Sequence, residues 1–382
     1  MSRIALAHDY FIQMGGAERV AEEFQAIFPA APMFTTVDRR QSHLDGGRGP
    51  VRTSWMQRLP INEKNYRKYF MLYPLAVESF DLSGFDLIIS SSSGYAKGIK
   101  KKKGAVHVNY CHTPMRWVWR YEDYAARERF GGVKRRALPS LLKILKLWDL
   151  RAADQPDLYI ANSQIVADRI RQCYGREATV IPPPIDVNRF SSNEPDEDFY
   201  LILSRLNSYK RLDLAIEACK KSNRPLVVIG DGPARAELEK LAGPHTRFLG
   251  RQPDTVAAQY AGRCRALIFP GEEDFGMTPL EINAAGRPVI AYRGGGAMET
   301  VVEGATGVFF NEQTADSLIL ALEEFESRAW LRPELVRHAE KFSPQVFASR
   351  IREFVAGAVP MSDVADFIEN SGNSTFSTTR IA

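Results

Sequence analysis

Two glutamates that follow an apolar run are the first candidates for chemistry in this chain. Glu273 and Glu281 stand eight positions apart around a Gly-Met-Thr-Pro turn, and the run before them, residues 266–269, is typical of a buried parallel strand. The sequence predicts a helix after the turn, with Thr278 as its N-cap, Pro279 in the first helical position and Glu281 completing a Thr-x-x-Glu capping box. Free backbone N–H groups at such a helix start favour an anion. Without a ligand, Glu281 would only cap the helix and Glu273 would be a solvated loop acid.

A pair of cations supplies a second candidate site. Arg205 and Lys210 lie in the loop after a predicted strand at residues 199–204, and a helix is predicted from about Leu212. A guanidinium forms a planar fork with phosphate oxygens, whereas an ammonium acts as a compact point charge, so the two side chains can converge on one diphosphate. Loop arginines and lysines are more often simply solvated, and this alternative stays open.

Glycines and a histidine at strand ends complete the candidates. Gly15 and Gly16 follow the first predicted strand, residues 3–8, and precede a helix, so a ligand can approach the backbone closely there. They do not form the Gly-x-Gly-x-x-Gly pattern, which disfavours a nicotinamide site. His112 ends a predicted strand at residues 106–112, and ligands of open α/β sheets bind beyond the carboxyl ends of strands. A lone histidine is, however, more often structural.

The composition is that of a soluble globular protein. The chain has 382 residues, 45% hydrophobic and 25% charged, and this length favours two or three domains. No apolar run approaches the roughly 20 residues of a membrane span, and the chain starts in a strand without signal-peptide features. Its four cysteines are scattered without a Cys-x-x-Cys pair, which predicts a reduced, cytoplasmic chain with no structural zinc.

The net charge of +4 conceals an asymmetry. Residues 1–180 carry ten more Lys and Arg than Asp and Glu, whereas the remainder carries six fewer. A basic half favours nucleic acid, a phosphorylated acceptor or a membrane surface, and the acidic half argues against nucleic-acid binding throughout the chain. Two segments carry this idea, the basic run at 97–104 and a predicted helix at 127–151 that mixes lysines with leucines and Trp148. A solvated turn and a core-packed helix with a basic outer face are the plain alternatives.

Strands alternate with helices along both halves, which predicts an α/β protein with two doubly wound domains. The proline-rich segment 180–186 breaks regular structure and is predicted to link a first domain at 1–185 to a second at 186–343. A further helix is predicted at about 344–358. Beyond it Ser, Thr and Asn accumulate, and residues 360–382 are predicted to be disordered, at least in part.

Together and in this order, these elements resemble the retaining glycosyltransferases of the GT-B fold, family 4 type, over about residues 8–310. The paired glutamates resemble the family's nucleotide-sugar motif, and Arg-Leu-x-x-x-Lys at 205–210 resembles its diphosphate-binding pair. His-Thr-Pro at 112–114, followed by Met-Arg-Trp-Val-Trp, is similar to bacterial O-antigen and exopolysaccharide mannosyltransferases. The resemblance implies two Rossmann-like domains that face each other across a cleft, an acceptor side first and a nucleotide-sugar side second. It also implies that the helix at 344–358 packs back on the first domain.

The resemblance further implies roles for individual residues. The catalytic set would be His112, Arg205, Lys210 and Glu273. Donor binding would fall to Gly15, Gly16, Arg205, Lys210, Gly250, Arg251, Glu273, Phe275, Gly276, Met277, Thr278 and Glu281. The cations and helix-start N–H groups would stabilise the departing diphosphate, while Glu281 accepts hydrogen bonds from ribose, Glu273 lies nearer the sugar and His112 positions it. No metal or other cofactor is expected, because the sequence offers no obvious Asp-x-Asp loop.

The resemblance implies transfer of a hexose with retention of configuration at the anomeric carbon. The expected hexose is mannose, with GDP-mannose as the donor. The acceptor would be a glycan or a polyprenyl-diphosphate-linked saccharide in surface polysaccharide or lipopolysaccharide synthesis, at the inner face of the cytoplasmic membrane. A UDP-hexose donor is the first alternative, because base choice depends on loop geometry. A nucleotide-sugar 2-epimerase or a non-catalytic nucleotide-sugar sensor would share the fold. Phosphorylase chemistry would need a pyridoxal lysine site, which the sequence does not reveal.

Overall fold

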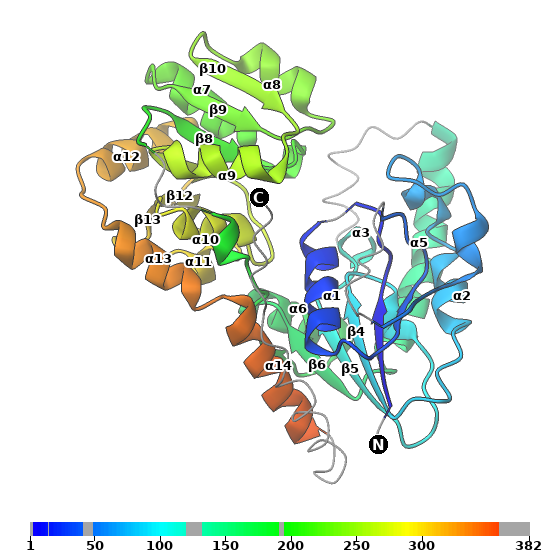
Figure 1. Ribbon diagram of the computed structural model, residues 1–382. Helices are drawn as coiled ribbons and strands as arrows, with labels where there is room; N and C mark the ends of the chain where they lie inside the picture. The colour runs from blue at the N-terminus through cyan, green and yellow to red at the C-terminus, as the bar shows by residue number, and fades with distance from the viewer. Residues whose placement is uncertain (1–2, 14, 41–48, 120–131, 191–194, 359–382) are drawn as a thin grey trace, which may run out of the picture.

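Two all-parallel sheets form the two lobes of the protein, described here by a computed structural model for residues 3–13, 15–40, 49–119, 132–190 and 195–358 (Figure 1). The first sheet has the strand order β3-β2-β1-β4-β5-β6-β7, and the second has the order β10-β9-β8-β11-β12-β13. The first-lobe strands are β1 Ile4–His8, β2 Met33–Thr35, β3 Val51–Thr53, β4 Leu87–Ser92, β5 Val106–Cys111, β6 Leu158–Ala161 and β7 Thr179–Val180. The second-lobe strands are β8 Tyr200–Leu203, β9 Leu226–Ile229, β10 Thr246–Gly250, β11 Ala266–Phe269, β12 Val289–Tyr292 and β13 Gly307–Phe310.

The strand order reverses between β1 and β4 in the first sheet and between β8 and β11 in the second. Ligands of such sheets bind outside the carboxyl ends of the strands at this reversal point. Each lobe therefore has one position that favours a ligand, and the predicted site residues follow these strands. The two sheets confirm the predicted fold class of two doubly wound α/β domains.

Helices cover the sheets because strands buried on both faces need apolar cover on both sides. The first lobe contains α1 Gly16–Ile27, α2 Tyr73–Glu78, α3 Arg116–Trp119, α5 Gly132–Ala152 and α6 Gln164–Tyr174, with the 3-10 helices η1 Trp55–Arg58, η2 Tyr66–Tyr69 and η3 Ala96–Gly98. The linker forms η4 Val187–Arg189. The second lobe contains η5 Ser208–Lys210, α7 Leu212–Lys221, α8 Arg235–Leu241, α9 Asp254–Arg263, α10 Met277–Ala284, α11 Ala297–Thr300, α12 Ala315–Glu326 and α13 Arg332–Glu340.

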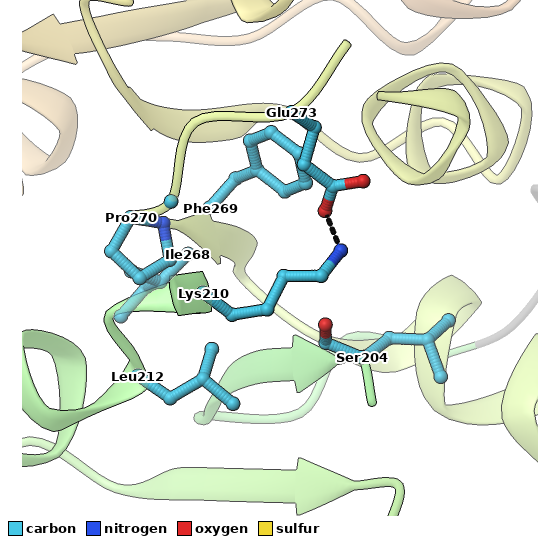
Figure 2. A pocket seen from close by; sticks show the side chains of 9 residues that line it. Ser204, Lys210, Leu212, Ile268, Phe269, Pro270 and Glu273 are labelled. Atoms are coloured by element: carbon cyan, nitrogen blue, oxygen red, sulfur yellow. Dashed lines mark hydrogen bonds and ion pairs between the residues drawn. The ribbon is translucent and has the colours of Figure 1, made fainter. Parts of the chain in front are cut away.

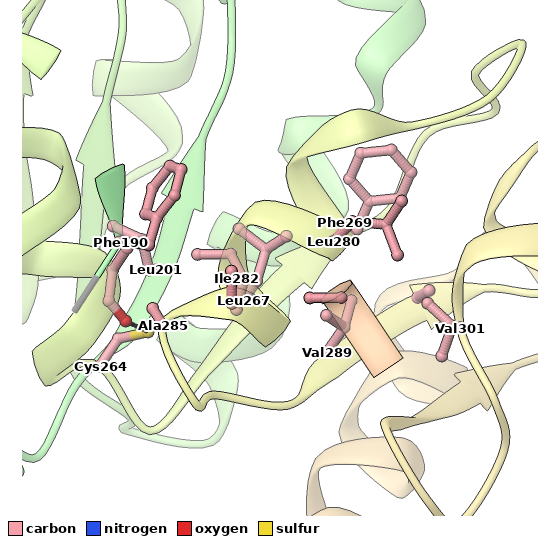
Figure 3. Close-up of a cluster of buried hydrophobic side chains, with 14 of the residues drawn as sticks. Phe190, Leu201, Cys264, Leu267, Phe269, Leu280, Ile282, Ala285, Val289 and Val301 are labelled. Atoms are coloured by element: carbon pink, nitrogen blue, oxygen red, sulfur yellow. Dashed lines mark hydrogen bonds between the residues drawn. The ribbon is translucent and has the colours of Figure 1, made fainter. Parts of the chain in front are cut away.

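Helix α10 is held in place by the apolar core of the second lobe. Its residues Leu280 and Ile282 lie among side chains of the sheet that include Leu267 and Val289, and all four are at most 1% exposed (Figure 3). Burying a side chain of this size stabilises the fold by about 1.5–3 kcal/mol. The helix that carries Glu281 is therefore fixed on the sheet by its apolar neighbours.

Helix α14, Pro344–Ala358, leaves the second lobe and runs along the first (Figure 1). Its buried residues Phe347, Ile351 and Val355 recur every four positions and belong to the first lobe's core. The Phe347 ring lies 5.6 Å from that of Phe24 and 5.8 Å from that of Tyr110. The C-terminal helix thus joins the two lobes a second time, in addition to the linker.

The first residue of the basic run at 97–104 is buried, whereas a solvated turn would expose it. Lys97 is 2% exposed, and its Nζ lies 2.5 Å from Oδ1 of Asp149 on α5. The next lysines also meet acids, in the pairs Lys100–Glu78, Lys101–Asp157 and Lys102–Asp86. The run therefore carries less free positive charge than its composition suggests.

Two sequence predictions fall on residues outside the described part of the chain, namely the disordered tail at 360–382 and the beginning of the basic helix at 127–131. The described part of that helix is α5. Within the described residues, every helix is too short or too polar to span a lipid bilayer.

Removing the Phe347 ring should loosen α14 from the first lobe. We expect Phe347→Ala to lower the free energy of unfolding by about 3–5 kcal/mol, because a fully buried aromatic side chain leaves a cavity. Urea unfolding followed by tryptophan fluorescence measures this loss. The control Ser349→Ala changes an exposed residue of the same helix and should stay within about 0.5 kcal/mol of wild type. A loss below about 1 kcal/mol in Phe347→Ala would contradict the assigned packing of α14.

Candidate active site

Three strand ends of the first lobe bring polar side chains together. His8 ends β1, Ser91 lies near the end of β4, and His112 follows β5 directly. The Ser91 hydroxyl oxygen lies 2.8 Å from His112 Nε2 and 3.1 Å from His8 Nδ1. Burial, together with the nearby His8, lowers the pKa of His112 to about 3, so the imidazole is neutral at physiological pH. His112 therefore offers one donor and one acceptor rather than a positive charge.

Asp9 braces the loop beside these residues. Its carboxylate accepts the backbone N–H groups of Ser93, Tyr95 and Ala96 at 2.7, 2.9 and 2.6 Å. The side chain is 3% exposed, so these bonds replace its lost hydration. Asp9 thereby ties the end of β1 to the beginning of η3 and keeps the switch point of the first sheet rigid.

Gly15 and Gly16 lie where the first lobe meets the second. A Cβ atom on Gly15 would lie 3.2 Å from Arg205 Nη2, and one on Gly16 would lie 3.0 Å from Met277 Sδ. Arg205 also donates from Nη1 to Gln13 Oε1 at 2.9 Å. The structure thus brings the glycine turn against two predicted donor-binding residues of the other lobe.

Lys210 ends η5, shortly after β8, and forms an ion pair with Glu273, which follows β11 (Figure 2). The two side chains are 13% and 24% exposed. Gly271 permits the close approach, since a Cβ there would lie 2.7 Å from the Lys210 carbonyl oxygen. Arg211 has a φ of 51°, a left-handed conformation that costs energy in a residue with a Cβ. The small hollow around the pair is lined by Leu203, Ser204, Leu212, Ile268, Phe269 and Pro270.

The loop that carries Glu273 rests on the glycines at 294–296. Gly295 has a φ of 63°, and a Cβ on it would lie 2.6 Å from the Glu273 carbonyl oxygen. Gly296 donates its N–H to the same oxygen at 2.8 Å. These glycines therefore allow the backbone of the glutamate loop to pack closely against them.

Helix α10 begins at Met277, with Gly276 as its N-cap at a φ of 82° and no side chain bonded to the helix end. The predicted capping box is therefore wrong, because Thr278 is already inside the helix and Glu281 lies in its second turn. Gly276 takes the cap position since a residue without a Cβ adopts this left-handed turn freely. The N–H groups of Met277 and Thr278 have no partner within the helix, which leaves two donors for an anion.

Glu281 is 8% exposed and held by two arginines. Arg189 at the end of the linker donates from Nη2 to Glu281 Oε1 at 2.7 Å, and Nη1 of Arg19 on α1 lies 3.5 Å from the same oxygen. Both arginines also reach Asp254 Oδ2, at 2.9 and 3.0 Å respectively. Burial raises the pKa of Glu281, and the two arginines oppose that shift. Oε2 accepts no hydrogen bond from any residue that the structure describes, so it is left for a ligand.

Asp274 connects the glutamate loop to the first lobe. It forms ion pairs with Arg116 and Arg169, and Arg169 Nη1 also lies 3.4 Å from Thr113 Oγ1. Since Thr113 follows His112, this contact places the histidine segment opposite the glutamate loop.

Glu299 of α11 makes another contact between the lobes. Its carboxylate accepts the N–H of Gln164 at 3.0 and 2.9 Å, and that of Ile165 at 3.4 Å. These residues begin α6, so a carboxylate of the second lobe satisfies the positive end of a first-lobe helix.

Three predicted donor-binding residues make contacts outside this group. The Phe275 ring is buried in the second-lobe core, 5.9 Å from that of Phe342. Gly250 has a φ of 69° and accepts the Gly230 N–H at 2.8 Å, which is a structural contact at the end of β10. The Arg251 side chain is 74% exposed.

Residue type and spacing did not predict the contacts of Arg19, Arg189 and Asp254. Arg19 and Glu281 are separated by 262 residues, and Arg189 and Asp254 by 65, so no local spacing marks these pairs. Arg116 belongs to the Met-Arg-Trp-Val-Trp segment that is similar to mannosyltransferases. That similarity was the one feature of the sequence that indicated a role for this residue.

The arrangement suits an anion with several oxygens. Arg205, Lys210 and the first N–H groups of α10 can share the charge of a diphosphate, while the free oxygen of Glu281 can accept hydroxyl groups. Across the lobe interface, neutral His112 can donate or accept one hydrogen bond. Among the described residues, no cluster of three or more His, Cys, Asp or Glu side chains is arranged to hold a metal ion.

Two family models match adjacent parts of the chain. The model described as Glycosyltransferase Family 4 matches residues 14–189, and the one described as Glycosyl transferases group 1 matches residues 184–342. Together they span both lobes and include every predicted site residue.

Curated relatives are distant. Human alpha-1,3/1,6-mannosyltransferase is 25% identical over 81% of this chain and 79% of its own length. An uncharacterized glycosyltransferase of Methanocaldococcus jannaschii is 27% identical over 50% of this chain, and the match spans 56% of that protein. A sulfoquinovosyl transferase of Arabidopsis thaliana is 30% identical over 43% of this chain, and the match spans 34% of that protein's length.

Solved structures confirm the predicted GT-B fold. Anabaena HepE in complex with UDP and glucose superposes with a TM-score of 0.68 at 19% identity, over 93% of this chain and all of that one. Sucrose-phosphate synthase from Thermosynechococcus elongatus superposes with a TM-score of 0.72 at 16% identity, over 94% of this chain and 99% of that one.

Two buried histidines should make folding sensitive to mild acid. Burial lowers the pKa of both His107 and His112 to about 3, whereas an unfolded histidine titrates near 6.5. Below that value the unfolded chain binds protons that the folded chain does not, so stability falls as pH drops. From pH 7 to pH 5 each histidine should account for a loss of about 2 kcal/mol.

Urea unfolding at pH 7 and pH 5 measures this loss. We expect His112→Asn and His107→Asn each to reduce the pH-dependent part by about 2 kcal/mol, whatever their effect at pH 7. An unchanged pH dependence in either variant would show that folding does not shift the pKa of that histidine, which would contradict its assigned burial as a neutral ring.

Proposed function

We propose a function from one premise, that this chain belongs to the group 1 glycosyltransferases of the family 4 type: it transfers a hexose from a nucleotide sugar to an acceptor. The observation that supports this most directly is the meeting of Arg205 and the start of α10 in the second lobe with the turn of Gly15 and Gly16 in the first. Lys210 pairs with Glu273, three positions before the N-cap of α10. The whole protein's activity and substrates are part of the proposal, since its first matches span about a third to a half of their relatives' length.

The leaving group defines the roles in the second lobe. Breaking the bond between sugar and phosphate puts negative charge on the departing nucleoside diphosphate. Arg205, Lys210 and the N–H groups at the start of α10 stabilise that charge, because fixed donors need little reorganisation as the charge develops. Glu281, oriented by Arg189 through Oε1, uses Oε2 to accept ribose hydroxyls.

The sugar lies between Glu273 and His112. Positive charge develops on the sugar ring as the diphosphate leaves, and the carboxylate of Glu273 stabilises it. His112 is neutral and buried, which suits a hydrogen bond to the sugar rather than proton removal from water. The acceptor hydroxyl attacks from the same face as the leaving group, forming the new bond to the anomeric carbon as the bond to the diphosphate breaks. Its proton passes to an oxygen of the departing diphosphate, and the configuration at the anomeric carbon is retained.

GDP-mannose is the proposed donor. The support is the resemblance of the 112–119 segment to mannosyltransferases and the alignment with the human mannosyltransferase over most of both chains. A UDP-hexose is the competing donor, and a 2-epimerase would act on a donor with no acceptor present.

A panel of nucleotide sugars distinguishes these donors. We expect GDP-mannose to raise the thermal unfolding temperature. UDP-glucose, UDP-galactose and UDP-N-acetylglucosamine should leave it unchanged. Product analysis with donor alone should give no epimer. Transfer is then measured as nucleoside diphosphate released only when an acceptor glycan is present. If only a UDP-sugar stabilised the protein, GDP-mannose would be refuted as the donor. If the donor alone gave an epimer, the proposed transfer would be refuted in favour of epimerisation.

The cations can be tested one at a time. We expect Arg205→Ala and Lys210→Ala each to lower kcat by about 100- to 1,000-fold, because each removes a fixed donor to the leaving group. The control Lys240→Ala changes an exposed lysine of α8 in the same lobe and should keep wild-type turnover. Initial rates at saturating donor, with thermal unfolding as a check on folding, give the answer. Near-normal rates in both site variants would refute their proposed roles.

We also propose that the acceptor is lipid-linked and that α5 contacts an anionic membrane. Ile144, Leu147 and Leu150 are 55%, 59% and 38% exposed on this helix, and Lys143 lies beside them. Apolar side chains next to lysines suit the boundary between lipid head groups and acyl chains. The basic run contributes less, because Lys100 to Lys102 already have acidic partners.

Flotation with phosphatidylglycerol-containing vesicles tests the membrane contact. Wild-type protein should bind, bind less as salt rises, and lose most binding in the double variant Ile144→Ser with Leu147→Ser. The control Leu320→Ser removes a residue that is 67% exposed on α12 of the second lobe and should bind like wild type. Equal binding by the double variant would refute the role of α5 and leave the catalytic proposal standing.

A further inference from the structure

His8, Ser91 and His112 form a connected row across three neighbouring strands. The row begins at the end of β1, crosses β4 and ends directly after β5, and these strands are adjacent in the sheet. His8 is 3% exposed, Ser91 1% and His112 8%. The proposed mechanism uses only His112, which leaves the other two residues without an assigned role.

The backbone fixes where the proton of His8 lies. Its Nδ1 is 3.0 Å from the Ser91 carbonyl oxygen, and a carbonyl oxygen can only accept a hydrogen bond. His8 Nδ1 therefore carries the proton and donates it toward Ser91. A protonated Nδ1 cannot also accept the Ser91 hydroxyl hydrogen, although it lies 3.1 Å from that oxygen.

The Ser91 hydroxyl hydrogen then has one remaining partner in the row, His112 Nε2, at 2.8 Å. If Nε2 instead carried a proton, the buried hydroxyl would accept two hydrogen bonds and leave its own hydrogen unused, at a cost of about 1–3 kcal/mol. Nε2 is thus the acceptor. The neutral ring must then carry its proton on Nδ1, which has no hydrogen-bond partner among the described residues.

We propose that His8 and Ser91 are positioning residues that hold His112 as the Nδ1–H tautomer. In this form His112 presents a hydrogen-bond donor to an oxygen of the bound sugar, and its only basic nitrogen is occupied by Ser91. The row thereby prevents His112 from activating water or the acceptor as a base. This inference rests on the proposed function for the sugar, whereas the tautomer itself follows from contacts within the first lobe.

A second serine–histidine pair on the same strands provides a matched control. Ser90 on β4 binds Nε2 of His107 on β5 at 2.7 Å, one position earlier on the serine strand. Successive side chains of a strand point to opposite faces, so this pair lies on the other side of the sheet from Ser91. Ser90→Ala removes a buried hydroxyl bound to a histidine, as Ser91→Ala does, without touching the row.

Nitrogen-15 spectra of histidine-labelled protein without substrate test the tautomer. In wild type, His112, identified by its loss in His112→Asn, should show a protonated Nδ1 and an unprotonated Nε2. Ser91→Ala should shift His112 toward the other tautomer or a mixture, and Ser90→Ala should leave its signals unchanged. A protonated Nε2 in wild type, or unchanged His112 signals in Ser91→Ala, would overturn the proposal.

Kinetics test the positioning role. With the donor found by the panel, Ser91→Ala should lower kcat by about 10- to 100-fold, Ser91→Thr should recover most of it by restoring the hydroxyl, and Ser90→Ala should stay near wild type. His8→Phe, which removes the ring nitrogens but keeps a ring beside Phe11, serves as a second variant if Ser91→Ala does not fold. It should move both the spectra and kcat in the same direction as Ser91→Ala.

The two proposals fail in different ways. Wild-type kcat in Ser91→Ala, together with a changed tautomer, would refute the role of the row and leave the transfer reaction standing. No transfer from any nucleotide sugar would refute the reaction, whereas the spectra would still report on the tautomer, since they are recorded without substrate.

Discussion

Ion pairs between the lobes are the interaction on which this site depends. Arg19 reaches Asp254 and Glu281, and Arg116 and Arg169 reach Asp274, so arginines of the first lobe meet acids of the second. Their environments differ. The side chains of Arg19 and Asp254 are 37% and 63% exposed, so water weakens this pair. The side chains of Arg189 and Glu281 are only 21% and 11% exposed. Glu281 therefore depends on Arg189 for its orientation more than on the exposed pair of Arg19 and Asp254.

The two lobes contribute different chemistry to the site. The second lobe supplies charges and helix-start N–H groups, held by a left-handed Gly276 and a tightly packed loop at 294–296. The first lobe supplies a neutral hydrogen-bonding group, because burial and the nearby His8 lower the pKa of His112. Such a division separates the groups that attract an anion from those that orient a neutral sugar.

Much of the fold follows from the sequence, because strands buried on both faces are continuous apolar runs bounded by glycines and polar turns. The site was partly predictable for a similar reason. Arg205, Lys210 and Glu273 follow strand ends, and Glu281 lies in the second turn of the helix after one, where residue type and spacing carry information. Motif spacing does not reveal side-chain direction, and the Phe275 ring therefore proved to belong to the core.

The contacts that could not be predicted depend on distance along the chain or on a choice of backbone conformation. Arg19 meets Glu281 only once both lobes exist, and Lys97 is buried because Asp149 of a distant helix neutralises it. The first residue of α10 could not be predicted, because both Gly276 and Thr278 are suitable N-cap residues and only the backbone conformation decides between them. The ion pair of Lys210 and Glu273 neutralises both charges within the second lobe. In the proposed reaction, the diphosphate of the donor takes the place of Glu273 beside Lys210. The ammonium then exchanges one counterion for another and need not be hydrated between turnovers.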